Sequence, residues 1–273
     1  MKHKSFSYIP IVLLSIICVY PFWWMLVNSL NTAADILAVP SLLPRSWRWQ
    51  NYAEIFTVQP FARQYVNTLF VSVMGTVGNI LFAALAGYGF ARLKFPGRNT
   101  AFLFFLTALM MPIEVTIIPL FFQMKTLKLL DTFIPLILIP IFASQGACST
   151  FLMRQYFITM PKELEEAARV DGLSTFSIFS RIIVPNAGPV ISSAAILAFL
   201  SIWNTYLEPL VFINTLKKFT LPLALANFND SYGLPQWHLQ LAATTLSIIP
   251  ILTVYFIFQQ KISNAMVNSG MKD

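Results

Sequence analysis

Long apolar segments alternate with shorter polar connections along the whole chain. Six segments have about the 20 residues that an α-helix needs to cross a bilayer. They cover residues 9–29, 67–91, 100–124, 133–153, 187–213 and 239–258. Unpaired backbone groups are costly in hydrocarbon, so apolar runs of this length must be helical. The pattern predicts an all-α integral membrane protein, a single domain over residues 1–273 with six transmembrane helices.

The first apolar segment also has one feature of a secretory signal peptide, because Lys2 and Lys4 precede it. It is longer than the usual apolar core of a signal peptide, and it runs into Trp23 and Trp24 without a small-residue cleavage site. We interpret it as a retained first span, with a cleaved signal as the alternative.

Composition supports the membrane assignment. Of the 273 residues, 57% are hydrophobic and only 11% are charged, and the mean hydropathy is +0.68. An ordinary soluble domain is about 25% charged. This balance excludes a soluble enzyme, a disordered tail and a nucleic-acid-binding module, although the net charge is +7.

Lys and Arg residues are distributed unevenly between the two sets of connections. The amino terminus, residues 92–98, residues 154–186 and the carboxy-terminal tail hold 11 of the 18, and the other three connections hold 7. Because positive residues are retained on the cytoplasmic side of a membrane, both termini are expected in the cytoplasm. The positive charge is then an orientation signal and implies no nucleic-acid partner.

The polar connection over residues 154–186 contains a short predicted helix. Pro161 suits the first helical position, acidic residues follow in the first turns, and Gly172 can supply a left-handed stop. Glu165 and Arg169 have the i, i+4 spacing of a weak intrahelical ion pair. One face of the predicted helix carries Leu164, Ala167, Ala168 and Asp171.

A capped helix of about ten residues is marginal on its own in water. Its narrow, alanine-rich face would let another backbone approach closely, which suits docking into a cytoplasmic partner. The alternative is a surface helix lying on the membrane. That alternative is weakened because the helix lacks a strong basic face and bulky apolar anchors. The residues alone leave both interpretations open.

Several short motifs occur in a fixed order around this helix. The most specific is Glu166-Ala167-Ala168, followed by Asp171-Gly172 and Ile183-Val184-Pro185. The others are 91–98 (ARLKFPGR), 111–115 (MPIEV), 129–132 (LLDT), 151–157 (FLMRQYF), 161–164 (PKEL), 203–204 (WN) and 209–210 (PL). In this order and spacing, nearly the whole chain resembles the EAA-loop, binding-protein-dependent ABC-transporter permeases of the maltose-type carbohydrate family.

That resemblance implies a permease subunit of an ATP-driven importer that works by alternating access in the cytoplasmic membrane of a prokaryote. It implies a second, related permease, two ATP-binding cassette subunits that bind ATP and Mg, and an extracytoplasmic solute-binding protein. This chain would be a non-catalytic subunit without a cofactor or metal of its own. A sugar or oligosaccharide is the favoured solute, with glycerol phosphate or another polyol derivative as the alternative.

The resemblance also makes the short helix a coupling helix that sits in a cleft of the ATPase. Glu166 would pair with a basic residue of the ATPase, and Gly172 would form the turn. The full set of coupling residues would be Leu164, Glu166, Ala167, Ala168, Asp171 and Gly172. Leu173 departs from the small residue usual after the glycine. The tail at 260–265 lacks the glycine common there, which leaves its role open.

Polar side chains within the predicted spans are the candidates for a solute pathway, because ionisable groups in a span normally face a cavity, a partner or the interface. Glu114 lies past the middle of the third predicted span, and it either lines the pathway or makes a structural hydrogen bond. Glu208 lies near the outer end of the fifth, where it lines the pathway or reaches the interface. Asn79 lies in a stripe of small residues that favours helix packing, with a pathway role as the alternative. Asn204 completes the pathway candidates.

Two rival functions come from other classes. A proton-coupled secondary transporter could use Glu114 and Glu208, but it has no need of a capped cytoplasmic helix. An integral membrane enzyme would need a polar catalytic cluster. The two histidines, His3 and His238, are far apart in sequence, and no Walker-type glycine loop is present. The ABC-importer permease is therefore the main prediction.

Overall fold

The computed structural model describes residues 9–229 and 232–270, with side chains described for residues 10–229 and 232–257. Within these ranges the chain is helical and contains no strand, only an isolated bridge between Asn229 and Pro235. The predicted all-α membrane fold is confirmed. Three helices are long and apolar enough to cross a membrane, or up to six if each bent pair of helices is one span.

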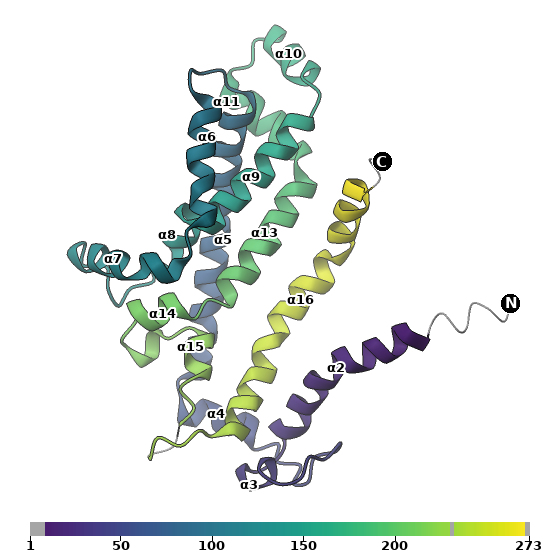
Figure 1. Ribbon diagram of the computed structural model, residues 1–273, viewed down its shortest axis with the longest axis vertical. Coiled ribbons are helices and arrows are strands. Elements are labelled where there is room, and N and C mark those ends of the chain that lie inside the picture. Colours follow the sequence, from purple (N-terminus) through teal and green to yellow (C-terminus); the bar gives the residue numbers. More distant parts are fainter. Residues whose placement is uncertain (1–8, 230–231, 271–273) are drawn as a thin grey trace, which may run out of the picture.

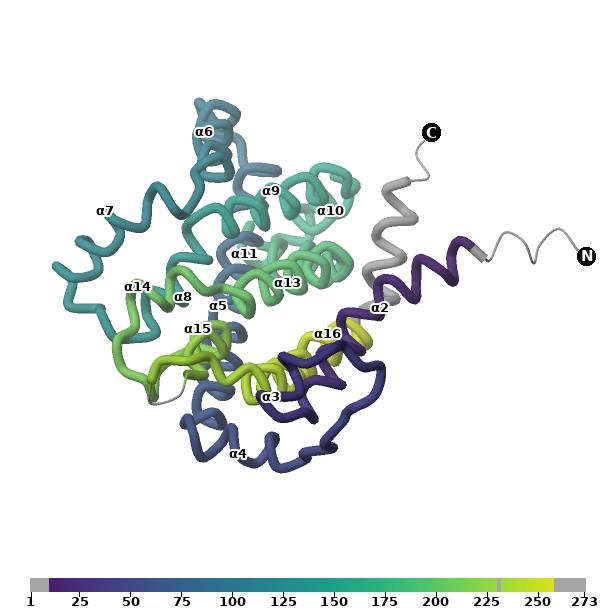
Figure 2. Tube along the Cα trace, turned by 60° about the horizontal axis from the view of Figure 1, so that its bottom comes forward, coloured from purple at the N-terminus to yellow at the C-terminus, as the bar shows by residue number. Residues whose placement is uncertain are grey.

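The three unbroken spans are α2 (Ile9–Ser29), α5 (Phe61–Arg92) and α16 (Trp237–Gly270). In α16, the part that is apolar enough to cross a membrane is Trp237–Ile257. Helix α5 lies in the middle of the bundle, packed against α8 (Ile134–Phe142), α9 (Ser144–Thr159) and α13 (Gly188–Trp203) (Figure 2). Helix α2 instead diverges from the bundle and contacts it mainly along α16 (Figure 1).

Small residues on α5 allow this close packing. A Cβ added at Gly87 would lie 2.7 Å from the Cβ of Met153 on α9, and one at Gly75 would lie 2.9 Å from the Cδ1 of Ile202 on α13. Small residues let membrane helices approach closely, so their packing energy comes from contact along the whole face. The stripe that contains Asn79 is thus a helix-packing face, as its spacing predicts.

The segment expected to form one span over residues 100–124 is broken. Helix α6 (Arg98–Leu106) continues into the short 3₁₀ helix η1 (Thr107–Met110), and α7 (Ile113–Thr126) then departs at 98°. The break falls at Met111 and Pro112, because proline has no N–H to donate and forces the preceding residue out of the helical region. The prediction of a continuous third span is wrong, and α7 projects from the side of the bundle (Figure 1).

The fourth predicted span, 133–153, consists of α8 and α9, bent by 42° at Ala143. Ala143 is extended, and Gly146 follows it at a very close approach. A Cβ on Gly146 would lie only 1.8 Å from the carbonyl oxygen of Ile141, so glycine is required there. Pro140 in the last turn of α8 removes one further backbone donor at this bend.

The fifth predicted span, 187–213, ends early. Helix α13 stops at Trp203, and the remainder forms a separate helix, α14 (Leu207–Phe212). The side chains of Asn204 and Thr205 donate to the carbonyls of Leu200 and Ser201, which satisfies the end of α13 locally. Pro209 lacks the N–H that would continue the helix.

Before α13, the chain forms α11 (Thr175–Ile178), the π-helical turn η2 (Phe179–Ile183) and α12 (Val184–Asn186), and this segment meets α13 at 79°. Helix α10 (Glu163–Val170) lies at the same end of the molecule. The opposite end carries α3 (Ala33–Ile36) and α4 (Asn51–Val58), and α15 (Leu221–Leu225) lies between α4 and α14 (Figure 1). The short 3₁₀ helix η3 (Leu216–Lys218) precedes α15 in the chain.

Candidate functional site at helix α10

Helix α10 is the predicted short polar helix, and its start differs slightly from the expectation. It begins at Glu163 rather than at Pro161, because the carbonyl of Lys162 accepts the first intrahelical hydrogen bonds. It ends with Asp171 as its cap, and Gly172 follows at φ +79°. This left-handed conformation favours glycine, so the predicted stop is confirmed.

The expected face of Leu164, Ala167, Ala168 and Asp171 is divided in the structure. Ala168 is 4% exposed and packs into a core cluster with Met153, Phe157 and Ile178. The outward surface instead carries five of the six predicted coupling residues: Leu164, Glu166, Ala167, Asp171 and Gly172. Val170, which the sequence reasoning did not select, is 88% exposed and extends this surface.

Glu165 fixes the inward side of α10 to the end of α5. Its Oε1 lies 3.1 Å from the Nε of Arg92, and the two side chains are only 7% and 5% exposed. The phenol of Tyr88 donates to Oε2 at 3.3 Å, and Arg92 also donates from Nη2 to the carbonyl of Met160 at 2.5 Å. A buried ion pair thus holds α10 against the bundle.

Sequence reasoning missed this pair. It assigned Glu165 to a weak bond with Arg169, which in the structure lies 3.9 Å away and is largely exposed. It treated Arg92 as an orientation signal and as part of the 91–98 motif, without assigning it a contact. The available signal was the spacing of Glu165 and Ala168 on one helix face, but nothing local to α10 indicates a basic partner at the end of α5.

The pathway candidates fall into separate places. Asn79 is fully buried, and its Nδ2 donates at 2.7 Å to the carbonyl of Pro140, which the bend after α8 leaves without its usual helical donor. Asn79 therefore supports the bend. Asn204 is exposed and bonds within its own helix end.

Glu114 and Glu208 are brought into the same region, because α7 and α14 contact each other. Glu114 is exposed on α7, and Glu208 is half-buried on α14. Both breaks in the predicted spans are needed for this proximity. The two acidic residues thus lie on helices that have left the regular spans.

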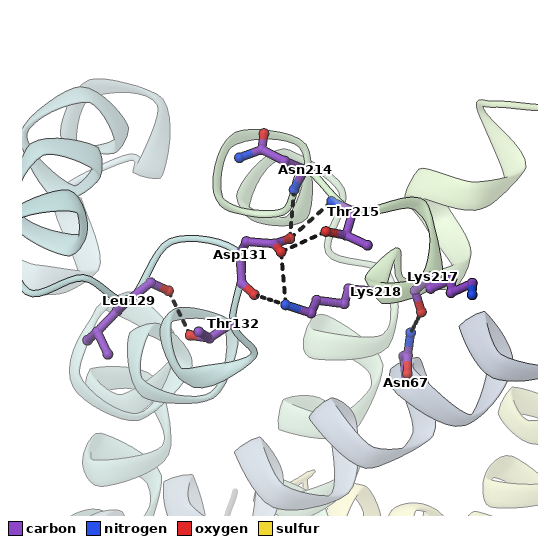
Figure 3. Close-up of polar contacts among 8 residues, drawn as sticks. All are labelled: Asn67, Leu129, Asp131, Thr132, Asn214, Thr215, Lys217 and Lys218. Carbon is purple, nitrogen blue, oxygen red and sulfur yellow. Dashed lines mark hydrogen bonds and ion pairs between the residues drawn. The ribbon is translucent and has the colours of Figure 1, made fainter.

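Asp131, in the connection between α7 and α8, joins this connection to the one after α14 (Figure 3). Its carboxylate accepts from the backbone N–H groups of Asn214 and Thr215 at 3.1 and 3.0 Å and from the Thr215 hydroxyl at 2.7 Å. The ammonium of Lys218 donates to the carboxylate at 2.8 Å and to the Asp131 carbonyl at 2.6 Å. We call Asp131, Asn214, Thr215 and Lys218 the Asp131 clamp.

The segment held by the Asp131 clamp is also bonded to α5 on its other side. Asn67 donates to the carbonyl of Lys217 at 2.9 Å (Figure 3) and to that of Phe219 at 3.1 Å. The N–H of Leu221 donates to the Thr68 hydroxyl at 2.6 Å. These bonds connect α5 to the segment after α14, and the Asp131 clamp joins that segment to the connection between α7 and α8.

The stability that Asp131 contributes is expected to hold at neutral pH and to disappear in acid. Lys218, and then Thr215, hold the pKa of the Asp131 carboxyl well below its ordinary value of 3.8. A group with a depressed folded-state pKa stabilises the fold above its unfolded pKa, and this gain is lost as pH falls through the folded pKa. Asp131→Asn should therefore cost about 1 kcal/mol at neutral pH, a small value because the ion pair is partly exposed.

Thermal unfolding of the purified protein over a pH series checks this expectation. The stability difference between wild type and Asp131→Asn should begin to narrow below about pH 4 and shrink further as pH falls toward the folded-state pKa. Glu54→Gln, which alters an exposed ion pair with Arg48 at 3.9 Å, is the control and should have a negligible effect throughout. A difference for Asp131→Asn that persists unchanged in acid would contradict the charge-based account.

Comparisons with known proteins identify the family of this chain. Residues 79–268, which include α10, match the family model described as "Binding-protein-dependent transport system inner membrane component". The chain belongs to this family. The predicted family resemblance is therefore confirmed, and the protein is a multi-pass inner-membrane permease of a binding-protein-dependent ABC importer.

Relatives cover the permease almost from end to end. The diacetylchitobiose uptake system permease protein NgcG of Streptomyces coelicolor is 31% identical over 97% of this chain and 88% of its own. The sn-glycerol-3-phosphate transport system permease protein UgpE of Yersinia enterocolitica is 30% identical over 97% and 96%.

A crystal structure of a bacterial ABC transporter involved in the import of the acidic polysaccharide alginate also matches the permease. It has a TM-score of 0.81 and 26% identity, and the match covers 94% of this chain and 96% of the other. Permeases of this family are non-catalytic subunits that work with an ATPase and a solute-binding protein. The importer function fits this likeness, and the proton-coupled alternative does not.

Proposed function

We propose that this permease carries a sugar or oligosaccharide across the cytoplasmic membrane by alternating access, driven by ATP hydrolysis in partner subunits. Support for the solute class comes from relatives named for diacetylchitobiose uptake and alginate import. A polyol phosphate is the second candidate, because UgpE is named for sn-glycerol-3-phosphate transport.

The observation that carries the proposal is the way α10 is mounted. Its inner side is anchored by the buried Arg92–Glu165 pair, while Leu164, Glu166, Ala167, Asp171 and Gly172 face outward. A short helix with a rigid base and an exposed apolar and acidic surface suits a socket on another protein. Ala168 contributes from the inner side by letting α10 pack closely on the bundle.

In this proposal α10 is the coupling helix. The assembled importer contains this chain, a second related permease and two ATP-binding cassette subunits, which bind ATP and Mg. The chain itself hydrolyses nothing. The end of the molecule that carries α10 faces the cytoplasm, and both termini lie on that side, in accord with the run of α16 from the α4 end toward the α10 end (Figure 1).

Movement of α10 would be transmitted through Arg92 to α5 and from there to the broken spans. Because α7 and α14 are tied to the bundle through the Asp131 clamp, their displacement would move Glu114 and Glu208 together. These two residues would line the outer part of the pathway. Asn79 would act at the bend after α8, and Asn204 at the end of α13.

Purification of the tagged chain from its native membrane tests the proposal. We expect the second permease and the ATPase to co-purify, and ATP hydrolysis in proteoliposomes to rise several-fold when the binding protein is loaded with its solute. The solute that the binding protein retains, sugar or polyol phosphate, decides the substrate class. Uptake by this chain alone, driven by a proton gradient without ATP, would contradict the proposal.

A further inference from the structure

A hollow of about 1140 Å³ lies between α10 and the connection from α5 to α6. Its walls are the stretch 91–100, together with Ile158 and the near side of α10. Its lining residues belong to the α10 end of the molecule, whereas Glu114 and Glu208 belong to α7 and α14 (Figure 1).

The charge in this hollow is strongly unbalanced. Five basic residues line it, Arg92, Lys94, Arg98, Lys162 and Arg169, against two carboxylates, Glu165 and Glu166. The charge of Glu165 is already taken by Arg92 at 3.1 Å. Within the described part of the chain, Lys94 and Lys162 have no ion-pair partner within 4.0 Å, so positive charge remains available.

One basic group in the hollow is held in place by the backbone. Nη1 of Arg98 donates to the carbonyl of Leu93 at 3.2 Å and reaches that of Ala91 at 3.5 Å. A guanidinium has five N–H donors in a planar fork, which suits the oxygens of a phosphate group. The remaining N–H donors of Arg98 are therefore available in the lining that Arg98 shares with Lys94.

The position of the hollow relates it to the membrane surface. The apolar span of α5 ends at Arg92, and α6 begins at Arg98, so the connection between them lies where the spans leave the hydrocarbon. Leu103 and Phe104 on α6 are 64% and 73% exposed and continue an apolar surface away from the hollow. A ligand with a phosphate at one end and acyl chains at the other would match both the basic hollow and the apolar surface of α6.

We propose that this hollow binds the phosphate-bearing headgroup of an anionic phospholipid, with its acyl chains lying along α6. Basic pockets at the ends of membrane helices attract anionic headgroups, and each Lys or Arg adds to the attraction. Lys94 lies in the α5–α6 connection and Arg98 is the first residue of α6, whereas Lys162 precedes α10 and Arg169 belongs to it. A headgroup between them would bridge the coupling helix to the spans, a consequence that rests on the proposed function.

Binding can be tested on the delipidated, assembled transporter by titration with short-chain phosphatidylglycerol, followed by native mass spectrometry. Wild type should bind phosphatidylglycerol and should not bind short-chain phosphatidylcholine. Lys94→Gln combined with Lys162→Gln should weaken phosphatidylglycerol binding about thirty-fold. Raised salt should weaken binding to wild type. The charge-matched control is Lys125→Gln combined with Lys217→Gln, two exposed lysines remote from the hollow, and it should bind as wild type does.

Three results would overturn the proposal. Equal phosphatidylglycerol binding by wild type and the Lys94/Lys162 variant would show that the hollow is not the site. Displacement of the lipid by inorganic phosphate at equal concentration would identify a soluble anion as the ligand. If the Lys94/Lys162 variant binds phosphatidylglycerol as wild type does but co-purifies with less ATPase, the hollow would be a protein-docking surface. The lipid readout does not depend on which solute the importer carries.

Discussion

Glu165→Gln is expected to destabilise the permease by about 3–5 kcal/mol, because it removes one partner of a buried ion pair. Glutamine keeps the shape of the side chain and an oxygen for the Tyr88 phenol. It leaves the Arg92 guanidinium, only 5% exposed, without a counter-charge. Thermal unfolding of the purified protein in detergent measures the loss.

Glu163→Gln is the matched control, since it makes the same chemical change at an exposed position in the same helix. Its effect should stay within about 0.5 kcal/mol. Replacement of both charged partners, Arg92→Met with Glu165→Met, should recover much of the stability lost in the single variant. Equal losses in Glu163→Gln and Glu165→Gln would show that the buried pair does not anchor α10.

The helical membrane fold was predictable because the lipid bilayer imposes it on long apolar segments. Long apolar segments have one stable backbone arrangement in hydrocarbon, so α2, α5 and α16 follow directly from hydropathy. The stop of α10 was predictable for a similar reason, and its start was predicted two residues too early. Its acidic first turn and Gly172 act locally and need no knowledge of the surrounding structure.

The breaks in the other spans were not predictable from apolar content, because both halves of each bent pair are apolar. Proline alone does not mark them either. Pro21, Pro119 and Pro250 lie inside continuous helices, whereas Pro112 and Pro140 lie at or beside breaks. Whether a proline breaks the helix depends on neighbouring residues. Asn79, for example, donates a hydrogen bond to the carbonyl of Pro140, which the bend leaves without a helical donor. The sites of bending are therefore properties of the packed bundle.

The anchoring contacts of the candidate site were missed for the same reason. Arg92 and Glu165 are brought together by the packing of α5, α9 and α10, and Asp131 reaches Lys218 only because α13 ends early. The 129–132 sequence was recognised as part of a family pattern, but no role followed from it. The tail contacts left open by residues 260–265 concern side chains outside the described residues.

Glu166→Lys is expected to lower ATP-driven uptake at least about thirty-fold while the permease remains folded. Glu166 is exposed and, among the described residues, forms no ion pair, so its reversal removes no internal contact. In the proposed complex it faces a basic residue of the ATPase. Loss of one partner of a buried interfacial charge pair costs about 2–5 kcal/mol, and reversal adds repulsion.

Gly172→Pro should have the same functional result by another route, since φ +79° is closed to proline and the turn after α10 must change. Uptake and solute-stimulated ATP hydrolysis are measured in proteoliposomes, and co-purification reports assembly. Glu54→Lys reverses a charge at the opposite end of the molecule and should leave uptake near wild type. Normal uptake and ATP hydrolysis in both Glu166→Lys and Gly172→Pro would contradict the coupling role of α10. Loss of uptake in Glu54→Lys as well would mean that charge reversal anywhere disturbs the importer.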